Sequence, residues 1–134
     1  MKLILKAAVL ACLPTASPAE PVIVPSAGSV SDTVQRLTAS VEGAGAKVFT
    51  VVDFCELQLV IFGDPQIGAL ALSADKMAAL SLPGKVLVYD SGNGTEMAYE
   101  VPAEMLGKWD IPSDAPVLQV MADTLDRITS AAAE

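Results

Sequence analysis

The 134-residue sequence contains no histidine and only two cysteines. Without histidine, neither a Ser-His-Asp triad nor a Cys-His pair can be built, because the general base is missing. Zinc and copper sites within one chain need histidines or several cysteines, so the composition also argues against such a metal site. We therefore expect no metal ion and no other cofactor, and histidine-dependent hydrolysis is excluded.

Basic residues are also scarce, with 8 lysines and arginines against 16 aspartates and glutamates. The net charge is −8, and it becomes −10 if the N-terminal segment that contains two of the lysines is removed. A strongly acidic chain is repelled by phosphate backbones and by anionic lipid. We expect neither nucleic acid nor a membrane surface as a partner, and the scattered acidic residues are typical of a solvated surface.

Residues 1–19 have the three parts of a secretory signal. Two lysines precede an apolar core at residues 7–13, and small residues lead to a cleavage site after Ala19. The core is far shorter than the about 20 residues that a membrane-spanning helix needs. We predict an exported protein, periplasmic or secreted, whose mature part is a single domain over residues 20–134. The alternatives are a lipoprotein anchored through Cys12 and a buried N-terminal helix.

Cleavage would leave Cys55 as the one cysteine, which excludes a disulfide within the chain. A single cysteine in an exported protein is either buried and inert or free to pair between chains. The acidic neighbours Asp53 and Glu56 argue against a reactive thiolate. Because cysteine is among the most often buried residues, we expect Cys55 to be buried.

Apolar spacing predicts two amphipathic helices. The first begins after Ser29, with Asp32 placed to complete a capping box, and covers residues 30–41. The second covers residues 115–131. Shorter helices are predicted over residues 66–72, 75–80 and 102–106. The predicted buried stripes of the two long helices are Val30, Val34, Leu37 and Val41, and Leu118, Met121, Leu125 and Ile128.

Five runs of β-branched and apolar residues predict strands, over residues 21–25, 47–53, 57–62, 85–89 and 95–101. Residues 91–94 are typical of a hairpin turn, so the last two strands should pair antiparallel. Strand 57–62 is apolar on both faces, which predicts a place in the middle of a covered sheet. Together the elements favour a small α+β domain, with a mostly antiparallel sheet and helices packed on one face.

The segment LVIFGDP, residues 59–65, resembles the L-x-I-F-G-N-P-like motif of the domain-of-unknown-function 302 family. The similarity extends through residues 33–37, 47–53, 82–89 and 97–99 and so covers nearly all of the predicted mature chain. The resemblance implies a small α+β domain, often exported in bacteria, with no established biochemical activity.

Two features depart from the family pattern. Family members usually have Asp-His at the end of the second strand, followed by a loop rich in alanine and glycine. Here Phe54 follows Asp53, the loop is almost absent, and its short replacement has poor turn chemistry. Asp64 stands where the family usually has asparagine. Any chemistry of the family histidine would be lost in this chain.

The candidate binding residues lie at the two ends of the strand 57–62: Asp53, Phe54, Phe62, Gly63, Asp64 and Pro65. The leading hypothesis is a non-catalytic module that binds a small molecule or a protein, favoured by any apolar groove beside Asp64. One alternative is an enzyme that uses Asp53, Glu56 and Asp64, and another is a degenerate paralogue that retains only assembly. Asp64 also suits a purely structural role as a helix N-cap. The apolar fraction of 52% further suggests a homodimer.

Overall fold

A five-stranded antiparallel sheet forms the centre of the protein, of which a computed structural model describes residues 19–134. The helices and strands, in chain order, are β1 (Val22–Ser26), α1 (Val30–Gly43), β2 (Lys47–Asp53), β3 (Leu57–Gly63), α2 (Pro65–Ala74), the 3₁₀ helix η1 (Lys76–Leu80), β4 (Gly84–Asp90), β5 (Thr95–Tyr99), α3 (Pro102–Leu106) and α4 (Pro116–Ala132). The predicted signal, apart from Ala19, and the alternative lipidation site Cys12 lie outside the described residues.

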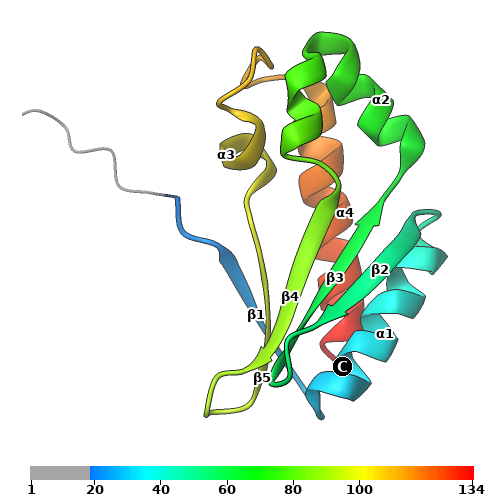
Figure 1. Cartoon of the computed structure of the whole chain (residues 1–134), viewed down its shortest axis with the longest axis vertical. Helices are drawn as coiled ribbons and strands as arrows, with labels where there is room; N and C mark the ends of the chain where they lie inside the picture. The colour runs from blue at the N-terminus through cyan, green and yellow to red at the C-terminus, as the bar shows by residue number, and fades with distance from the viewer. Residues whose placement is uncertain (1–18) are drawn as a thin grey trace, which may run out of the picture.

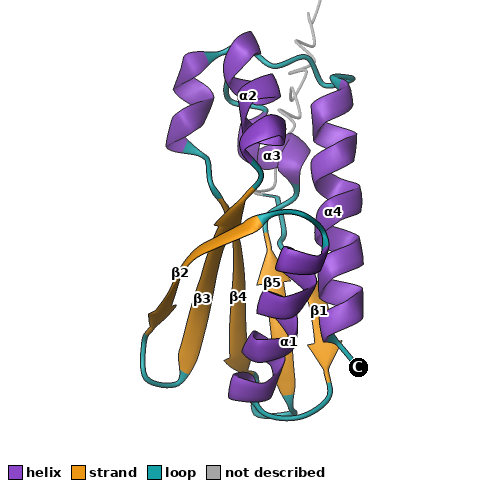
Figure 2. Cartoon of the chain, turned by 90° about the vertical axis from the view of Figure 1, so that its right-hand side faces the viewer, coloured by secondary structure: helices purple, strands orange, loops and turns teal. Residues whose placement is uncertain are grey.

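The strands lie side by side in the order β1-β5-β4-β3-β2, and every neighbouring pair is antiparallel. Helices α1 and α4 pack against each other and cover one face of the sheet (Figure 1). The shorter helices α2, η1 and α3 gather at one end of the sheet, beside the first half of α4 (Figure 2). This arrangement confirms the predicted α+β fold with helices on one face.

Helix α1 begins with the predicted capping box. The Ser29 hydroxyl accepts a hydrogen bond from the Asp32 N–H at 3.1 Å, and the Asp32 carboxylate accepts one from the Ser29 N–H at 3.3 Å. Val34, Leu37 and Val41 are buried, as their spacing predicts. The cap and the stripe together orient α1 so that its apolar side meets the sheet.

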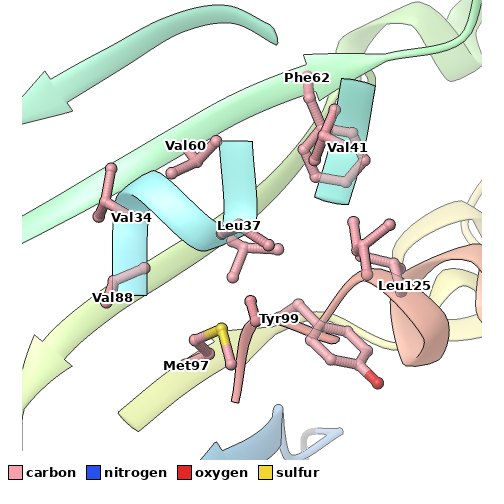
Figure 3. Close-up of a cluster of buried hydrophobic side chains, with 12 residues drawn as sticks. Val34, Leu37, Val41, Val60, Phe62, Val88, Met97, Tyr99 and Leu125 are labelled. Carbon is pink, nitrogen blue, oxygen red and sulfur yellow. The ribbon is translucent and has the colours of Figure 1, made fainter. Parts of the chain in front are cut away.

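The main core lies between this sheet face and the two long helices (Figure 3). Alternate residues of the strands, among them Val60, Phe62 and Val88, meet Leu37 of α1 and Leu125 of α4. The predicted stripe of α4 is buried along its whole length. A second cluster, which includes Leu106 and Met121, lies among the short helices and the first half of α4. The groove described below lies where the two clusters meet.

Arg36 of α1 links its helix to β1 and α4, at the end of the sheet opposite the short helices. Its Nε donates to the carbonyl oxygen of Ala132 at 3.0 Å, at the C-terminal end of α4. Its second guanidinium nitrogen donates to the Ser26 hydroxyl at 3.1 Å and to the Ala27 carbonyl. A positive charge at this position also suits the negative end of the helix dipole.

The opposite face of the sheet differs from the sequence prediction. Leu57, Leu59 and Ile61 of β3 point away from α1, and their cross-strand partners on β4 include Leu87 and Tyr89. Among residues 19–134, no helix covers this side of the strands (Figure 2). The expectation that β3 is covered on both faces is therefore wrong for the described chain, because all the sheet-packed helices lie on one side. We call this surface the helix-free face.

The β2–β3 turn also corrects a prediction, because Cys55 is exposed instead of buried. The Glu56 N–H donates to the Phe54 carbonyl at 3.0 Å, which closes a tight γ-turn around Cys55. Cys55 has a φ of 75°, in the left-handed region that favours glycine. The Asp53 carboxylate supports the turn by accepting the Cys55 N–H at 2.8 Å. A side chain at the tip of so short a hairpin cannot reach the core.

Several elements differ from the prediction by one or two residues at their ends. Strand β5 stops at Tyr99 instead of residue 101, because Pro102 begins α3. The segment after Asp75 is a 3₁₀ helix, with the Asp75 carboxylate accepting the Met77 N–H at 2.8 Å. These differences are confined to one or two residues and leave the order of elements as predicted.

Candidate functional site

The predicted site residues fall into two groups at opposite ends of β3. Asp53 and Phe54 lie at the β2–β3 turn, whereas Phe62, Gly63, Asp64 and Pro65 lie where β3 leads into α2. The seven residues of β3 separate the groups by roughly 20 Å at about 3.3 Å per residue. A single site that uses all of them is therefore excluded. The same separation shows that the predicted carboxylate site of Asp53, Glu56 and Asp64 is wrong.

Asp64 caps helix α2. Its Oδ1 accepts hydrogen bonds from the Gln66 N–H at 2.8 Å and from the Ile67 N–H at 3.4 Å. Pro65 follows in the first helical position, where its fixed φ suits the helix and its missing N–H removes no helical bond. The structural role predicted for Asp64 is thus present, and it sets the direction in which α2 leaves the sheet.

A groove of about 370 Å³ lies beside this turn. Helices α2 and α4 line it together with the segments that leave β3 and enter β4. Residues of both hydrophobic clusters line the groove: Phe62 and Leu125 belong to the first cluster, and Met105 and Met121 to the second. The short helices therefore do not pack closely against the sheet, and the space between the two layers is open and apolar.

A bulge in β2 contributes an aromatic side chain to the groove. The β2–β3 register shifts between Val48 and Thr50, so Phe49 is the extra residue in its strand. Phe49 is 52% exposed and lines the groove. A Cβ at Gly63 would come within 3.0 Å of the Phe49 ring, so glycine at that position makes room for the ring.

Gly68 lines one wall of the groove, where it contributes no side chain. It lies inside α2, where glycine costs roughly 0.5–1 kcal/mol relative to alanine. A Cβ at Gly68 would meet no atom within 4 Å, so packing does not require a glycine there. Gly68 lines the groove, and a larger side chain there would meet no packed neighbour at its Cβ.

Few polar groups line the groove. They belong to Asp64, Lys85, Glu100 and Thr124, among walls that are otherwise apolar. The nearby helix η1 is held by Asp75, whose second carboxylate oxygen accepts the Asp110 N–H at 3.0 Å. That bond and the one from Met77 lower the pKa of Asp75 below its ordinary value of 3.8. Asp75 thereby joins η1, which contributes Ala79 to the groove, to the connector before α4.

Within residues 19–134, no group of three or more histidine, cysteine, aspartate or glutamate side chains is placed to hold a metal ion. The one cysteine of the described chain, Cys55, lies at the far end of β3. No helix in the same part of the chain is long and apolar enough to cross a membrane.

Comparison with known families identifies the fold. A family model described as "Domain of unknown function DUF302" matches residues 22–134. The chain belongs to this family. A crystal structure of an uncharacterized conserved DUF302 protein from Bacillus stearothermophilus superimposes with a TM-score of 0.65, over 84% of this chain and 94% of the other, at 20% sequence identity. At that identity the likeness establishes the shared DUF302 fold alone.

Curated relatives of this DUF302 chain are longer proteins. "Fluoride-specific ion channel FluC 1" of Brucella suis is 32% identical over an alignment of 84 positions, which covers 54% of this chain and 33% of that protein. "Fluoride-specific ion channel FluC 2" of Brucella melitensis is also 32% identical over an alignment of 84 positions, which covers 31% of its length. The DUF302 chain thus spans about a third of the length of these relatives.

The sequence predicted the residues at one end of the groove but not the residues that form its walls. Phe62, Gly63, Asp64 and Pro65 all line it. Phe49 was missed because a bulge is not visible in a regular strand pattern. Gly68 could have been found from the sequence, since a glycine inside a predicted helix is unfavourable and usually has a packing or functional role.

Proposed function

We propose that this DUF302 domain is a non-catalytic binding module whose groove accepts a small apolar molecule. The observation that supports it most is the groove itself, an open space of about 370 Å³ with apolar walls beside the Asp64 turn. Ligand sites in proteins are mostly apolar clefts of about 300–1,000 Å³ with a few placed polar groups. The groove has both properties, and Gly68 lines it without a side chain.

The charge of the protein favours a neutral or cationic ligand over an anionic one. Asp64 and Glu100 line the groove against one basic residue, Lys85. The chain after Ala19 has 6 basic and 16 acidic residues, and a field of that sign lowers the local concentration of anions. Methionine at positions 105 and 121 adds adaptable, polarizable contacts.

A titration with a neutral fluorescent probe, N-phenyl-1-naphthylamine, tests this proposal. Residues 20–134, which contain every described helix and strand, should bind the probe with a saturable rise in emission. Gly68→Leu should weaken binding by at least about tenfold, because Gly68 lines the groove and we expect the leucine to occupy part of it. The matched control is Gly43→Leu, at another helical glycine with no atom within 4 Å of a built Cβ and outside the groove lining.

Two results would contradict the proposal. One is a parent protein that gives no saturable signal. The other is a Gly68→Leu variant that binds as tightly as Gly43→Leu. Both leucines replace a helical glycine, so neither variant should lose helix stability.

We also propose that the module works outside the cytoplasm, as the order of charged, apolar and small residues in the segment 1–19 suggests. Intact-mass measurement on protein from a bacterial host should find a chain that begins at Glu20. A lipid-modified species beginning at Cys12 would favour the lipoprotein alternative. A chain that still begins at Met1 would contradict export by cleavage.

A further inference from the structure

The helix-free face presents an apolar row that crosses the whole sheet. The strand registers place Ile23, Ala98, Leu87, Leu59 and Val52 next to one another, one from each strand. Ile23 is 44% exposed, although isoleucine is a residue that proteins usually bury. The other four residues of the row are partly exposed, and a continuous apolar surface that no helix covers is typical of an interaction site.

We infer that this face binds a second copy of the chain in a two-fold symmetric dimer. The centre of the face is Leu87 on β4, the middle strand of the five. A two-fold interface places the same surface against itself, so it needs an apolar centre that fits its own copy. Two sheets packed face to face at about 10 Å, with strands within about 30° of each other, meet this requirement.

The area of the face is at the lower limit for such a dimer. Three strands have seven residues and two have five, and at about 3.3 Å by 4.8 Å per residue they cover roughly 490 Å². Two copies would then cover roughly 980 Å² in total, close to the about 1,000 Å² expected of a specific interface. We therefore expect a weak dimer that forms at high micromolar concentration.

The charges at the ends of the face favour one orientation. Lys85, at the start of β4 where the strand also borders the groove, lies beside Ile61 at one end of the face. Glu96 lies beside Tyr89 at the other end, where it accepts the tyrosine hydroxyl at 2.7 Å. When the central strands cross antiparallel about Leu87, each Lys85 approaches the Glu96 end of the other copy. Glu100 follows β5 at the Lys85 end, and its negative charge offsets part of this attraction. The charges therefore select the orientation more than they add affinity.

Sedimentation equilibrium of residues 20–134 tests the dimer. The parent should be dimeric at high micromolar concentration. Leu87→Glu places two like charges against each other at the two-fold axis, and should raise the dissociation constant by about 100-fold or more. The control is Val120→Glu, at a side chain that is 42% exposed on α4, which should leave the dimer intact. Circular dichroism confirms that both variants remain folded.

A charge exchange tests the orientation. Lys85→Glu should weaken the dimer, and adding Glu96→Lys should restore it. Within one chain the two positions lie four strand residues apart, roughly 13 Å, so restoration reports contact between copies. A monomeric parent, a Leu87→Glu variant that dimerises like Val120→Glu, or a double variant weaker than Lys85→Glu would each overturn the inference.

Discussion

Asp64 illustrates how one side chain links the sequence motif to the groove. Its Oδ1 accepts two backbone N–H groups at the start of α2, and α2 forms a wall of the groove. Loss of such a cap costs about 0.5–2 kcal/mol. We therefore expect Asp64→Ala to lower the free energy of unfolding by that amount and Asp64→Asn to be nearly neutral, since asparagine caps equally well.

Denaturant unfolding of the two variants beside the parent measures this difference. An aspartate retained only to bind a ligand would behave in the opposite way. Its removal would leave stability unchanged or higher, and the asparagine variant would not differ from the alanine variant in stability.

Cys55 is the residue whose backbone is strained, because a side chain in the left-handed region costs roughly 1–2 kcal/mol. Glycine avoids that cost but loses about 0.5–1 kcal/mol through greater freedom in the unfolded chain. We expect Cys55→Gly to raise the free energy of unfolding by roughly 0.5–1 kcal/mol. Cys55→Ala, which keeps the strain, should unfold like the parent. A glycine variant less stable than the alanine variant would show that the turn is relaxed in solution.

Among the elements, two aspartates at helix starts, Asp32 in the α1 capping box and Asp75 as the cap of η1, make stability depend on pH. The Ser29 hydroxyl and N–H lower the pKa of Asp32, and the N–H groups of Asp110 and Met77 lower the pKa of Asp75, both from an ordinary value of 3.8. A carboxyl whose pKa is lower in the folded state stabilises the fold above its unfolded pKa. That contribution is lost as the pH falls through the lower folded value. We expect stability to fall from about pH 4 downward.

Urea midpoints measured between pH 6 and pH 2 test this dependence. The double variant Asp32→Asn, Asp75→Asn should have a lower midpoint at pH 6 and a shallower decline with acid. Asp114→Asn is the control, at an exposed aspartate in the connector before α4. A double variant that declines as steeply as the control would assign the acid sensitivity to other groups.

The elements themselves were largely predictable, because their signals are local. The capping box at Ser29, the α4 stripe through Leu125 and the turn at residues 91–94 all have the predicted form. The exposure of Cys55 was not predictable, since it follows from a γ-turn whose sequence contains none of the usual turn residues, such as glycine or asparagine. The uncovered face of β3 was missed for a different reason. A strand that is apolar on both sides has the same sequence whether a helix or a second chain covers it.

For the whole molecule, the candidate site depends on how two layers meet. The groove forms because the short helices above the sheet pack on α4 more than on the strands. Its walls come from β2, α2, α3 and α4, which are far apart in the chain. Only the Phe62–Pro65 end was visible in advance, because that turn is one continuous motif. Tertiary packing decides the rest.

The most direct test of the binding groove is a titration of ¹⁵N-labelled residues 20–134 with N-phenyl-1-naphthylamine, followed through the well-separated glycine amide signals. The groove is lined by Gly63, Gly68 and Gly84, and these three signals should shift together and saturate. Gly43 and Gly92 lie outside the groove and should stay in place. Shifts confined to Gly92, or no saturable shift at the three groove glycines, would contradict the proposed site.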